Sequence, residues 1–312
     1  MRVAVVTGTG GIGFEIALAL ARGGMEVVLA GRNAEAGAAA VARIRAAVRD
    51  ADAGAGEGAD ADAGADVRFE PLDLADTDSV RALAARLRGR YASLDLLMCI
   101  AGLMMPDRLS RTKEGCEMQF AVNYLGHFLL ARELLPLLSA GMGPDGGGGR
   151  VVTVTSIANH PLRFDLADAT AARGYDAGIS YALSKLCCLM FARELDARSR
   201  EGGWRVSACC AHPGLARTRL FSYGRGFTMT LLRGIFFALP FLRQSAAHAA
   251  LPALYAATSP RAVGGALYGP LLCFFGPPRR ALPPLRALSR AKCAALWALS
   301  ESLLGGPSDG CC

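Results

Sequence analysis

The sequence predicts an α/β fold in which helices cover both faces of one doubly wound, parallel sheet. Short apolar runs alternate with longer segments of helical periodicity along most of the 312 residues, and a glycine-rich turn follows the first apolar run. Strands that are apolar throughout are buried on both faces, so helices must connect and cover them. Because 52% of the residues are hydrophobic, the chain can bury one large core, and we expect a single domain over residues 1–312.

The expected elements follow in order along the chain. Six strands are predicted from short apolar runs: VAVV near residue 3, EVVLA near 26, VRFEPL near 67, LDLLMCIA near 94, VVTVT near 151 and RVSACC near 205. Five helices are predicted between and after them, over residues 12–22, 34–49, 77–88, 113–138 and 180–198. This alternation is typical of a parallel sheet with helical crossovers.

Charged residues are distributed unevenly along the chain. Residues 50–66 are acidic and of low complexity, and we expect a surface insertion there because the segment has too little apolar surface to fold. Residues 279–292 are basic, within a C-terminal helix and tail expected over 279–312. For the formal charge of +7, a solvated surface is the first interpretation and membrane-surface contact the second; nucleic-acid binding is not expected.

The ten cysteines indicate reduced thiols rather than disulfides. They lie in apolar strand and helix patterns, as in Cys187, Cys188, Cys209 and Cys210, without metal-ligand spacing, so we expect buried thiols and no metal. The chain enters a strand pattern directly, so no secretory signal is expected, and the apolar residues 229–242 are too few for a spanning helix. The expected location is the cytoplasm, with peripheral contact to an intracellular membrane left open.

A glycine-rich turn separates the first strand from the first helix. In TGTGGIG, Gly8, Gly10 and Gly13 have the G-x-G-x-x-G spacing, and the helix opens from Ile12 onward; Gly11 and Ile12 are expected to contact the cofactor with these glycines. Such a turn lets a pyrophosphate approach the helix N-terminus, whose free N–H groups and dipole favour anions. With a strand before it and a helix after it, the motif favours a dinucleotide site over a plain glycine-rich turn.

The residues after the second and third strands bear on the choice of dinucleotide. An NAD site usually offers a carboxylate to the ribose 2′-OH, whereas this chain has Arg32, which can pair with a 2′-phosphate; the alternative is a surface arginine. Asp73, after the third strand, could accept a hydrogen bond from the adenine amino group or cap the next helix. We therefore expect NADP(H) rather than NAD as the cofactor.

A tyrosine and a lysine in YALSK provide candidate acid–base chemistry. Tyr181 and Lys185 are four residues apart and lie on one face of the predicted helix. A phenol with a pKa of about 10 is a poor acid–base group at neutral pH, and a nearby ammonium would stabilise the phenolate. Ser156 ends a strand at the carboxyl edge of the sheet, where its hydroxyl could hold a substrate oxygen. The alternative for Tyr181 and Lys185 is an ordinary exposed pair.

Together these motifs resemble the short-chain dehydrogenase/reductase family, especially its retinol-dehydrogenase-like branch. The matching pieces occur in order over nearly the whole chain: TGTGGIG, AGRN, LDL, AVNYLGHFLL, VVTVTSIANH, YALSK, AHPGLARTRL and LWALSESLLG. The resemblance implies a Rossmann-type fold with a C-terminal substrate lid, and hydride transfer between nicotinamide and an alcohol or carbonyl carbon.

The resemblance also implies roles for individual residues. Asn123 takes the position of the helix asparagine that holds a water linking the lysine to solvent, completing a tetrad with Ser156, Tyr181 and Lys185. Tyr181 would be the proton donor or acceptor and would also contact the cofactor, and Lys185 would bond the nicotinamide ribose. The remaining cofactor contacts implied are Leu74, Ala101, Gly102, Pro213, Gly214 and, on the nicotinamide side, Thr218.

Two departures from the family pattern concern the cofactor. The family's T-G-x-x-x-G-x-G has one residue more than TGTGGIG, so the loop must close differently around the phosphates. The family's N-N-A-G after the fourth strand is replaced by Cys99, Ile100, Ala101 and Gly102. Because that asparagine braces the strand and lines the cofactor ribose, we expect weaker cofactor binding or a less stable loop.

The C-terminal third suggests an apolar substrate. Residues 219–245, the variable lid of the family, are rich in Phe, Leu and Met, which suits a retinoid, steroid, fatty or prenyl alcohol or carbonyl compound; the alternative is a lid packed on its own core. In residues 284–304 leucines recur at helical spacing, and packing against the domain is favoured over membrane binding. Cys311 and Cys312 at the end of the sequence could be lipidated.

The hypothesis that follows is an NADP(H)-dependent oxidoreductase for an apolar alcohol or carbonyl substrate. The competing one, drawn from the altered loop and the lost asparagine, is a dinucleotide-binding scaffold or redox-sensing protein without turnover. An epimerase of the extended relatives is set aside because Phe14 stands where those enzymes need glycine. The family often dimerises through the tyrosine-bearing helix and the helix before it, so a homodimer is open.

Overall fold

The computed structural model describes residues 2–53, 65–160, 166, 171, 174–215 and 244–306. Its centre is one eight-stranded sheet in the order β3-β2-β1-β4-β5-β6-β7-β8, in which β1 to β7 are parallel and β8 is antiparallel to β7. The strands are β1 Val3–Thr7, β2 Glu26–Gly31, β3 Val67–Pro71, β4 Leu96–Cys99, β5 Arg150–Val154, β6 Ser207–Ala211, β7 Leu267–Pro270 and β8 Pro278–Ala281. The six predicted strands are confirmed, and β7 and β8 are additional.

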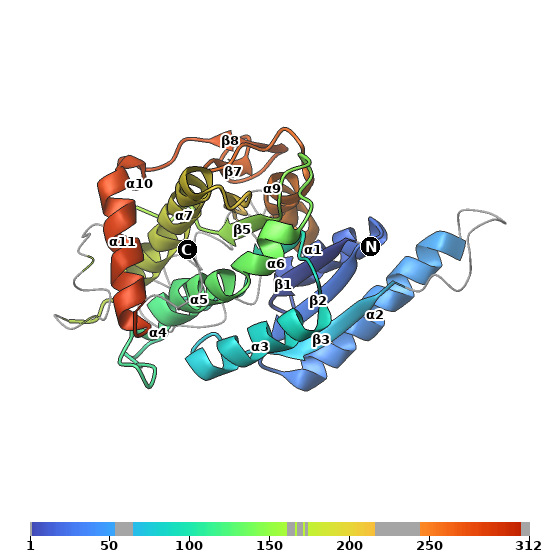
Figure 1. The fold of residues 1–312 in the computed structure, drawn as a ribbon, viewed down its shortest axis with the longest axis horizontal. Helices are drawn as coiled ribbons and strands as arrows, with labels where there is room; N and C mark the ends of the chain where they lie inside the picture. Colours follow the sequence, from blue (N-terminus) through green and yellow to red (C-terminus); the bar gives the residue numbers. More distant parts are fainter. Residues whose placement is uncertain are drawn as a thin grey trace.

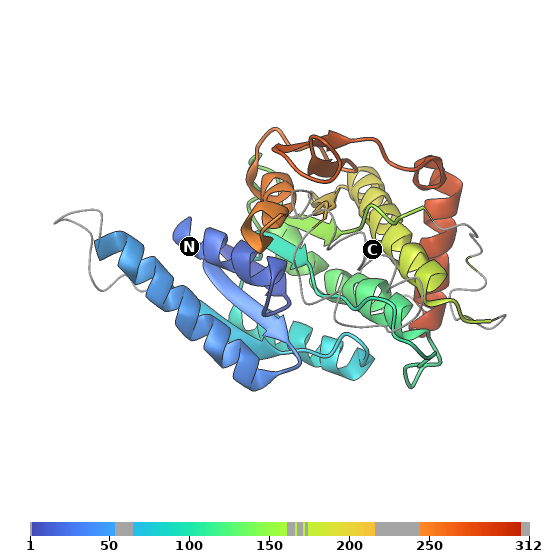
Figure 2. The ribbon, with the colours of Figure 1, turned by 180° about the vertical axis from the view of Figure 1, so that it is seen from behind.

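Helices cover both faces of the sheet, as predicted (Figures 1 and 2). One face carries α1 Ile12–Arg22, α2 Ala34–Ala53 and α9 Ala246–Thr258. The other carries α3 Thr77–Arg90, α4 Met118–Phe120, the π-helix η1 Ala121–Leu125, α5 Gly126–Glu133, α6 Leu135–Ala140, α7 Ala177–Gly202, α10 Leu285–Leu288 and α11 Arg290–Leu303. The strand order reverses between β1 and β4, and in open α/β sheets ligands bind at the carboxyl ends of the strands beside this point.

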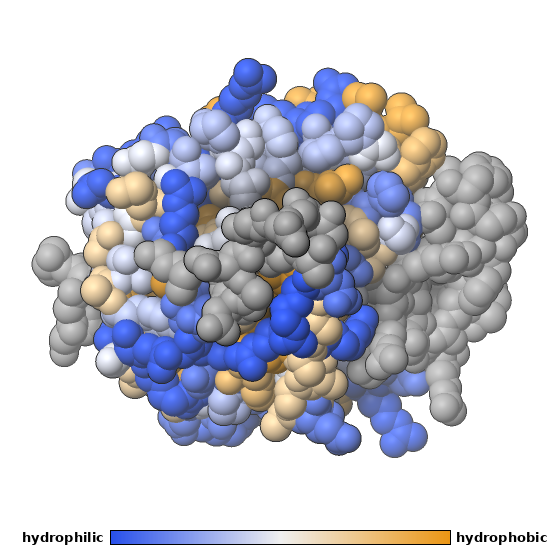
Figure 3. All heavy atoms as spheres, turned by 90° about the vertical axis from the view of Figure 1, so that its right-hand side faces the viewer, coloured by the Kyte–Doolittle hydropathy of each residue, from blue (hydrophilic) through white to orange (hydrophobic). Residues whose placement is uncertain are grey.

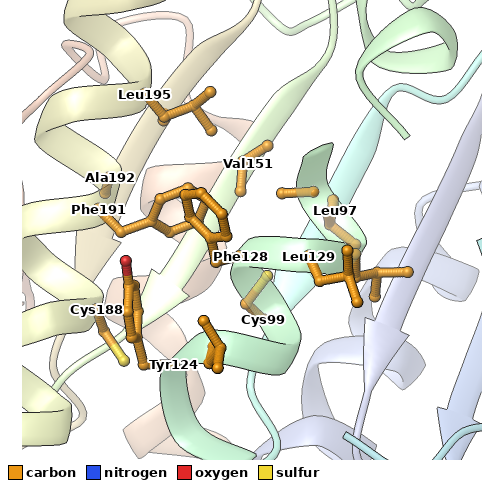
Figure 4. Packing of buried hydrophobic residues seen from close by; sticks show 14 of the residues in the cluster. Leu97, Cys99, Tyr124, Phe128, Leu129, Val151, Cys188, Phe191, Ala192 and Leu195 are labelled. Carbon is orange, nitrogen blue, oxygen red and sulfur yellow. The ribbon is translucent and has the colours of Figure 1, made fainter. Parts of the chain in front are cut away.

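Aromatic packing joins the C-terminal helix to the second face. Phe128 of α5 lies 5.4 Å from Phe191 of α7 and 4.9 Å from Trp297 of α11, measured between ring centroids. Figure 4 shows the first two rings meeting over β5 and β4. The hydroxyls of Tyr124 and Ser300 also share a 2.6 Å hydrogen bond. The prediction that the closing helix packs on the domain is therefore confirmed for α11.

The single helix predicted over 113–138 is wrong. The helical segment begins at Met118, where the Glu117 side chain caps it by accepting from Phe120 N, and passes through the π-helix η1. It breaks again at Leu134, after which Pro136 stands in the first turn of α6. Proline has no N–H to donate, so it fits the start of a new helix better than the interior of a long one.

Other helix ends also differ from the prediction. Helix α2 continues to Ala53, so the acidic segment 50–66 begins as helix, while residues 54–64 lie outside the described ranges. Helix α7 spans Ala177–Gly202 instead of 180–198, because Asp176 caps its start and Gly203, at φ +67°, ends it. The tail is two helices instead of one, since Ser289 caps α11 and separates it from α10.

The cysteines and the C-terminal segments agree only in part with the prediction. Seven of the eight cysteines in the described ranges are buried and free, but Cys273 is exposed, so the expectation of buried thiols is wrong there. Of the predicted lid 219–245, only Gln244 and Ser245 are described; Thr218, Cys311 and Cys312 lie outside the described residues. No helix within the described part of the chain is both long enough and apolar enough to cross a membrane.

Candidate active site

Two threonines of the VVTVT strand hold α7 against the carboxyl end of β5. Thr153 and Thr155 point to the same side of the chain because they are two residues apart in extended backbone. Their hydroxyls donate to main-chain carbonyls one helical turn apart in α7: Thr153 to Cys188 at 3.0 Å and Thr155 to Lys185 at 2.6 Å. The Lys185 ammonium donates in turn to the Val154 carbonyl at 3.0 Å. The position of Lys185 is thus fixed by the end of the strand.

Tyr181 lies one turn before Lys185 on the same face of α7. Both side chains are only 4% exposed, and the ammonium lies 6.0 Å from the centroid of the phenol ring. The alternative of an ordinary exposed pair is therefore wrong. The ring packs against Met104 and Met105 and is bordered by Ala158. Apolar side chains therefore border the ring on this side.

Ser156 follows β5 by two residues and faces the same region. Its hydroxyl oxygen accepts a 3.1 Å hydrogen bond from the Ala158 N–H, and its carbonyl accepts from the Asn159 N–H at 3.1 Å. Since Ala158 also packs against the cluster of Met104, Met105 and Tyr181, the Ser156 turn adjoins that cluster. The structure therefore gathers the predicted serine, tyrosine and lysine around the end of β5.

Asn123 lies within the π-helix η1, and its side chain makes three hydrogen bonds within the protein. Its Oδ1 accepts from Leu103 N at 2.8 Å, while Nδ2 donates to the Leu103 carbonyl at 3.0 Å and to Ser184 Oγ at 2.9 Å. A Cβ on Gly102 would lie 2.8 Å from Asn123 Oδ1 and 3.4 Å from Lys185 Nζ. Asn123 thus joins the Gly102 turn to α7, and its predicted water-binding role stays a prediction.

A threonine and a histidine brace the turn after β4, where the resembling family has asparagine. Thr7 Oγ1 accepts from the N–H groups of Ile100 at 2.9 Å and Ala101 at 3.0 Å. The same hydroxyl lies 2.9 Å from His127 Nε2, and His127 Nδ1 lies 3.0 Å from the Asn123 carbonyl. Because a carbonyl can only accept, Nδ1 carries the hydrogen, and Thr7 donates to the bare Nε2.

The histidine of this brace is neutral at pH 7. Burial lowers the pKa of His127 to about 4. The brace joins the end of β1, the turn after β4 and the π-helix through groups that are all satisfied. Sequence reasoning missed both residues, although the spacing of His127 four residues after Asn123 on one helix face is a signal that could have been used.

The glycine turn forms a cradle at the start of α1. Gly8 has φ +95° and Gly11 φ +53°, conformations that favour glycine, and a Cβ on Gly13 would lie 2.5 Å from the Gly8 carbonyl oxygen. The shortened loop closes through a 2.7 Å bond from Gly8 N to the Ala30 carbonyl. Gly11 is the N-cap and has no side chain to occupy the first-turn N–H groups, and a Cβ on Gly10 would meet nothing within 4 Å. The geometry suits a phosphate group.

The predicted adenosine-side residues follow β2 and β3 at the same edge. Thr7 pairs with Ala30, so Arg32, two residues further on, is exposed beside the glycine turn. Asp73 follows β3, and its Oδ1 accepts from Ala75 N at 2.9 Å. Asp73 does not cap α3, because the N-cap of that helix is Asp76.

The close contact between Leu74 and Gly126 explains why the AVNYLGHFLL motif has a glycine at position 126. The Leu74 carbonyl packs so closely on the start of α5 that a Cβ at Gly126 would collide with it. The loop after β3 therefore rests directly on the helix that follows η1. This contact gives Leu74 a structural place at the edge where the cofactor is predicted.

The segment after β6 is anchored by a glutamine. Gln244 Nε2 donates to the carbonyls of Pro213 at 3.1 Å and Phe274 at 2.6 Å, and its N–H donates to the Leu215 carbonyl at 2.9 Å. Gly214 has φ +68°, with the Phe274 carbonyl against its Cα. Both ends of the segment 216–243 are thereby held together beyond β6.

Residues 2–225 match the family described as short chain dehydrogenase, which covers more than half of the chain. The chain belongs to the short-chain dehydrogenase family. It is 36% identical to polyprenol dehydrogenase of Mus musculus over 84% of this chain and 73% of that protein. It is 32% identical to retinol dehydrogenase 13 of Homo sapiens over 97% of this chain and 85% of that protein.

Solved structures agree with the family fold. An uncharacterized protein from Mycobacterium paratuberculosis is 31% identical and superposes with a TM-score of 0.73, covering 97% of this chain and 93% of that one. A short-chain dehydrogenase/reductase from Burkholderia xenovorans, at 23% identity and a TM-score of 0.64, covers 86% of this chain and 94% of that one and supports the fold alone. As a short-chain dehydrogenase the protein is a hydride-transfer oxidoreductase for CH–OH groups that uses a nicotinamide dinucleotide, and the glycine cradle fits such a group.

Proposed function

We propose that this short-chain dehydrogenase interconverts an apolar alcohol and its aldehyde or ketone with NADP(H), and that Tyr181 transfers the proton. The observation that carries the proposal is the fixed Lys185 ammonium, bonded to Val154 and placed one turn from the buried Tyr181. The turn of Ser156 adjoins the cluster that contains Tyr181, through Ala158. This arrangement supports a site in which Ser156 and Tyr181 act on one substrate oxygen.

Each side chain has a separate part in the reaction. A bound nicotinamide supplies the hydride in reduction and accepts it in oxidation. The Ser156 hydroxyl donates to the substrate oxygen and orients it toward Tyr181. In reduction the Tyr181 hydroxyl gives its proton to that oxygen as the carbon gains the hydride, leaving an alcohol and a phenolate. In oxidation the same phenolate takes the alcohol proton.

Lys185 favours the charged form of the tyrosine. A positive charge near a phenol stabilises the phenolate that proton transfer leaves behind. The ammonium is held by Val154 on one side, and Asn123 and Gly102 lie within reach of it on the other. Its remaining hydrogens can bond a ribose hydroxyl or a water, the two partners predicted for it.

The choice of NADP(H) rests on the end of β2. No carboxylate follows that strand directly: Arg32 and Asn33 come after Gly31, and Asn33 caps α2 by accepting from Ala36 N at 2.8 Å. The guanidinium of Arg32 is exposed at the glycine turn and suits a 2′-phosphate.

The preference for an apolar substrate rests on two supports. The tyrosine ring borders Met104 and Met105, so the proton donor lies among apolar side chains. Two similar proteins are named for polyprenol and retinol, both long apolar alcohols. In the sequence, the segment 219–245 is rich in Phe, Leu and Met, as expected of a lid for an apolar substrate.

A turnover assay tests the proposal. The purified full chain is given NADPH or NADH with retinal, a prenyl aldehyde, a steroid ketone or a short polar aldehyde, and loss of reduced nicotinamide is followed. We expect oxidation of NADPH in preference to NADH, and a larger kcat/KM for the apolar carbonyl compounds. Nucleotide binding without turnover of any carbonyl or alcohol would contradict the proposal and favour the dinucleotide-binding scaffold.

A further inference from the structure

The C-terminal third of the chain carries a concentrated positive charge. Residues 202–300 contain twelve Arg or Lys and no Asp or Glu. Since the whole chain has a formal charge of +7, the remaining residues together carry a net charge of −5. The net positive charge of this dehydrogenase therefore comes from one contiguous part of its sequence.

The same part of the chain exposes large apolar side chains. The most exposed are Leu282, at 96%, and Leu285, at 84%, and the others are Leu271, Leu272, Phe274 and Leu288. Scattered exposed apolar side chains are ordinary on protein surfaces, but six within eighteen residues, five leucines and one phenylalanine, form a cluster in sequence. We call these six residues with Arg279 and Arg280 the C-terminal edge surface.

This surface runs along the outermost strand of the sheet. Leu271, Leu272 and Phe274 lie in the β7–β8 connection, Arg279 and Arg280 in β8, and the other leucines just beyond it and in α10. Figures 1 and 2 show the connection, β8 and α10 following one another along a single side of the molecule. In Figure 3 apolar and hydrophilic side chains both reach the surface along the edge that carries β7 and β8 in Figure 1.

The described fold does not bury these side chains. Strand β8 pairs with β7 on one side and is the last strand of the sheet, and Arg279 and Arg280 within it are exposed. In α10 only Ala287 is buried. The described residues of this chain therefore leave these leucines available to a partner.

We propose that the C-terminal edge surface docks this protein on a phospholipid bilayer that contains anionic lipid. Aliphatic side chains enter the boundary between headgroups and acyl chains, and arginines bind anionic headgroups while their stems remain in apolar contact. The proposal goes beyond the function proposed above and does not require it.

Two other partners fit the surface less well. A nucleic acid would pair with the arginines but would leave the exposed leucines unburied, because its affinity comes from phosphate contacts. A second copy docked through the same patch would place arginines against arginines, since an isologous interface repeats one surface and this one has no acid. A bilayer satisfies both kinds of side chain at once.

One end of the C-terminal edge surface adjoins the site edge. The β7–β8 connection leaves the carboxyl end of β7, the same sheet edge at which Lys185 meets Val154, whereas Leu282 and Leu285 follow the other end of β8. The Phe274 carbonyl of that connection also holds Gln244, which anchors the segment after β6. If the substrate is apolar, as proposed, it could pass from the bilayer to the site with little exposure to water.

Vesicle binding of the full chain tests the docking. Phosphatidylcholine vesicles with and without phosphatidylserine are sedimented with wild type, Leu282→Ser/Leu285→Ser and Arg279→Gln/Arg280→Gln at low and high salt. We expect binding to the anionic vesicles only, weakened by salt, with a loss of affinity of about fivefold for each arginine removed and a similar or larger loss for the leucine pair. The controls are Met142→Ser, at a 59% exposed methionine elsewhere, and Arg49→Gln on α2, which should bind as wild type.

Three outcomes would overturn the proposal: no binding of wild type to anionic vesicles, equal losses in the control variants, or a dimer in light scattering that the leucine substitutions dissociate. The last would assign the surface to a second copy. Because the assay involves no turnover, vesicle binding with an inactive enzyme would contradict only the proposed function, and turnover without vesicle binding would contradict only the docking.

Discussion

The Thr155 hydroxyl donates a 2.6 Å hydrogen bond to the carbonyl of Lys185, the residue whose ammonium bonds back to the neighbouring Val154 carbonyl at 3.0 Å. Strand and helix are therefore locked in one register at the point where the candidate chemistry lies. The position of the ammonium relative to Tyr181 follows from this lock, because the two residues share one face of α7.

Removal of the Thr155–Lys185 hydrogen bond should lower kcat markedly while it lowers the free energy of unfolding only slightly. In Thr155→Val the side chain keeps its shape and loses the bond to Lys185, which costs about 1 kcal/mol of unfolding free energy. We expect kcat at saturating nucleotide to fall by about tenfold, a barrier increase of about 1.4 kcal/mol, because Lys185 is less well placed. Thr153→Val is the matched control: it loses an equivalent bond, to Cys188, and should lose similar stability with near-normal kcat. Equal losses of kcat in both variants would show that Thr155 acts only through stability.

The brace between Thr7 and His127 should control cofactor affinity. Thr7→Val removes the acceptor of the Ile100 and Ala101 N–H groups, which destabilises the turn by about 1–3 kcal/mol. We expect the Kd for the nucleotide to rise about tenfold, measured by tryptophan fluorescence titration. Thr7→Ser retains the hydroxyl and should restore binding; failure of serine to do so would mean that the methyl group, not the hydrogen bonds, matters.

Two buried histidines should make the protein sensitive to mild acid. Burial lowers the pKa of His127 and of His212 to about 4, below the usual value of about 6.5, so between these values the unfolded chain binds more protons than the folded one. The contribution of each to stability is complete above pH 6.5 and is lost as pH falls toward 4. From pH 7 to pH 5 we expect a loss of about 2 kcal/mol for each histidine.

Urea unfolding at the two pH values measures this loss. His127→Gln and His212→Gln should each be less stable than wild type at pH 7 and should each show a smaller decrease at pH 5. A variant whose stability falls between the two pH values as much as that of wild type would exclude that histidine as a source of the acid sensitivity.

Arg32 should distinguish the two nucleotides. Arg32→Ala removes the charge proposed to meet the 2′-phosphate, and a charge-assisted hydrogen bond of this kind corresponds to about tenfold or more in affinity. The Kd for NADPH should rise by that amount while the Kd for NADH stays constant. Arg49→Ala, at an exposed arginine on α2, should change neither value. A parallel rise in both values for Arg32→Ala would assign Arg32 to the stability of the turn.

Local signals made much of the fold predictable. The six strands from β1 to β6 and the glycine turn were recognisable because apolar runs and glycine spacing are properties of neighbouring residues. Strands β7 and β8 were missed because they are short, and β8 at the sheet edge exposes Arg279 and Arg280 where a buried strand would be apolar. The break at Leu134 was missed because apolar periodicity continues through it.

The site was only partly predictable for a related reason. Tyr181 and Lys185 lie close in sequence, so their shared helix face could be inferred. The bond between Thr7 and His127 joins residues 120 positions apart, and no local pattern predicts it. The loss of the family's asparagine suggested a weakened turn, whereas in the structure Thr7 accepts from the Ile100 and Ala101 N–H groups of that turn.

The Tyr181→Phe variant tests the central claim most directly. Its rate of NADPH-linked carbonyl reduction and its Kd for NADPH are measured beside those of Tyr255→Phe, a tyrosine on α9 across the sheet. We predict that Tyr181→Phe keeps its nucleotide affinity and loses turnover by about 10²–10⁴-fold, the range for a proton-transfer group, while Tyr255→Phe is unchanged. Turnover by Tyr181→Phe at the wild-type rate would show that Tyr181 does not transfer the proton.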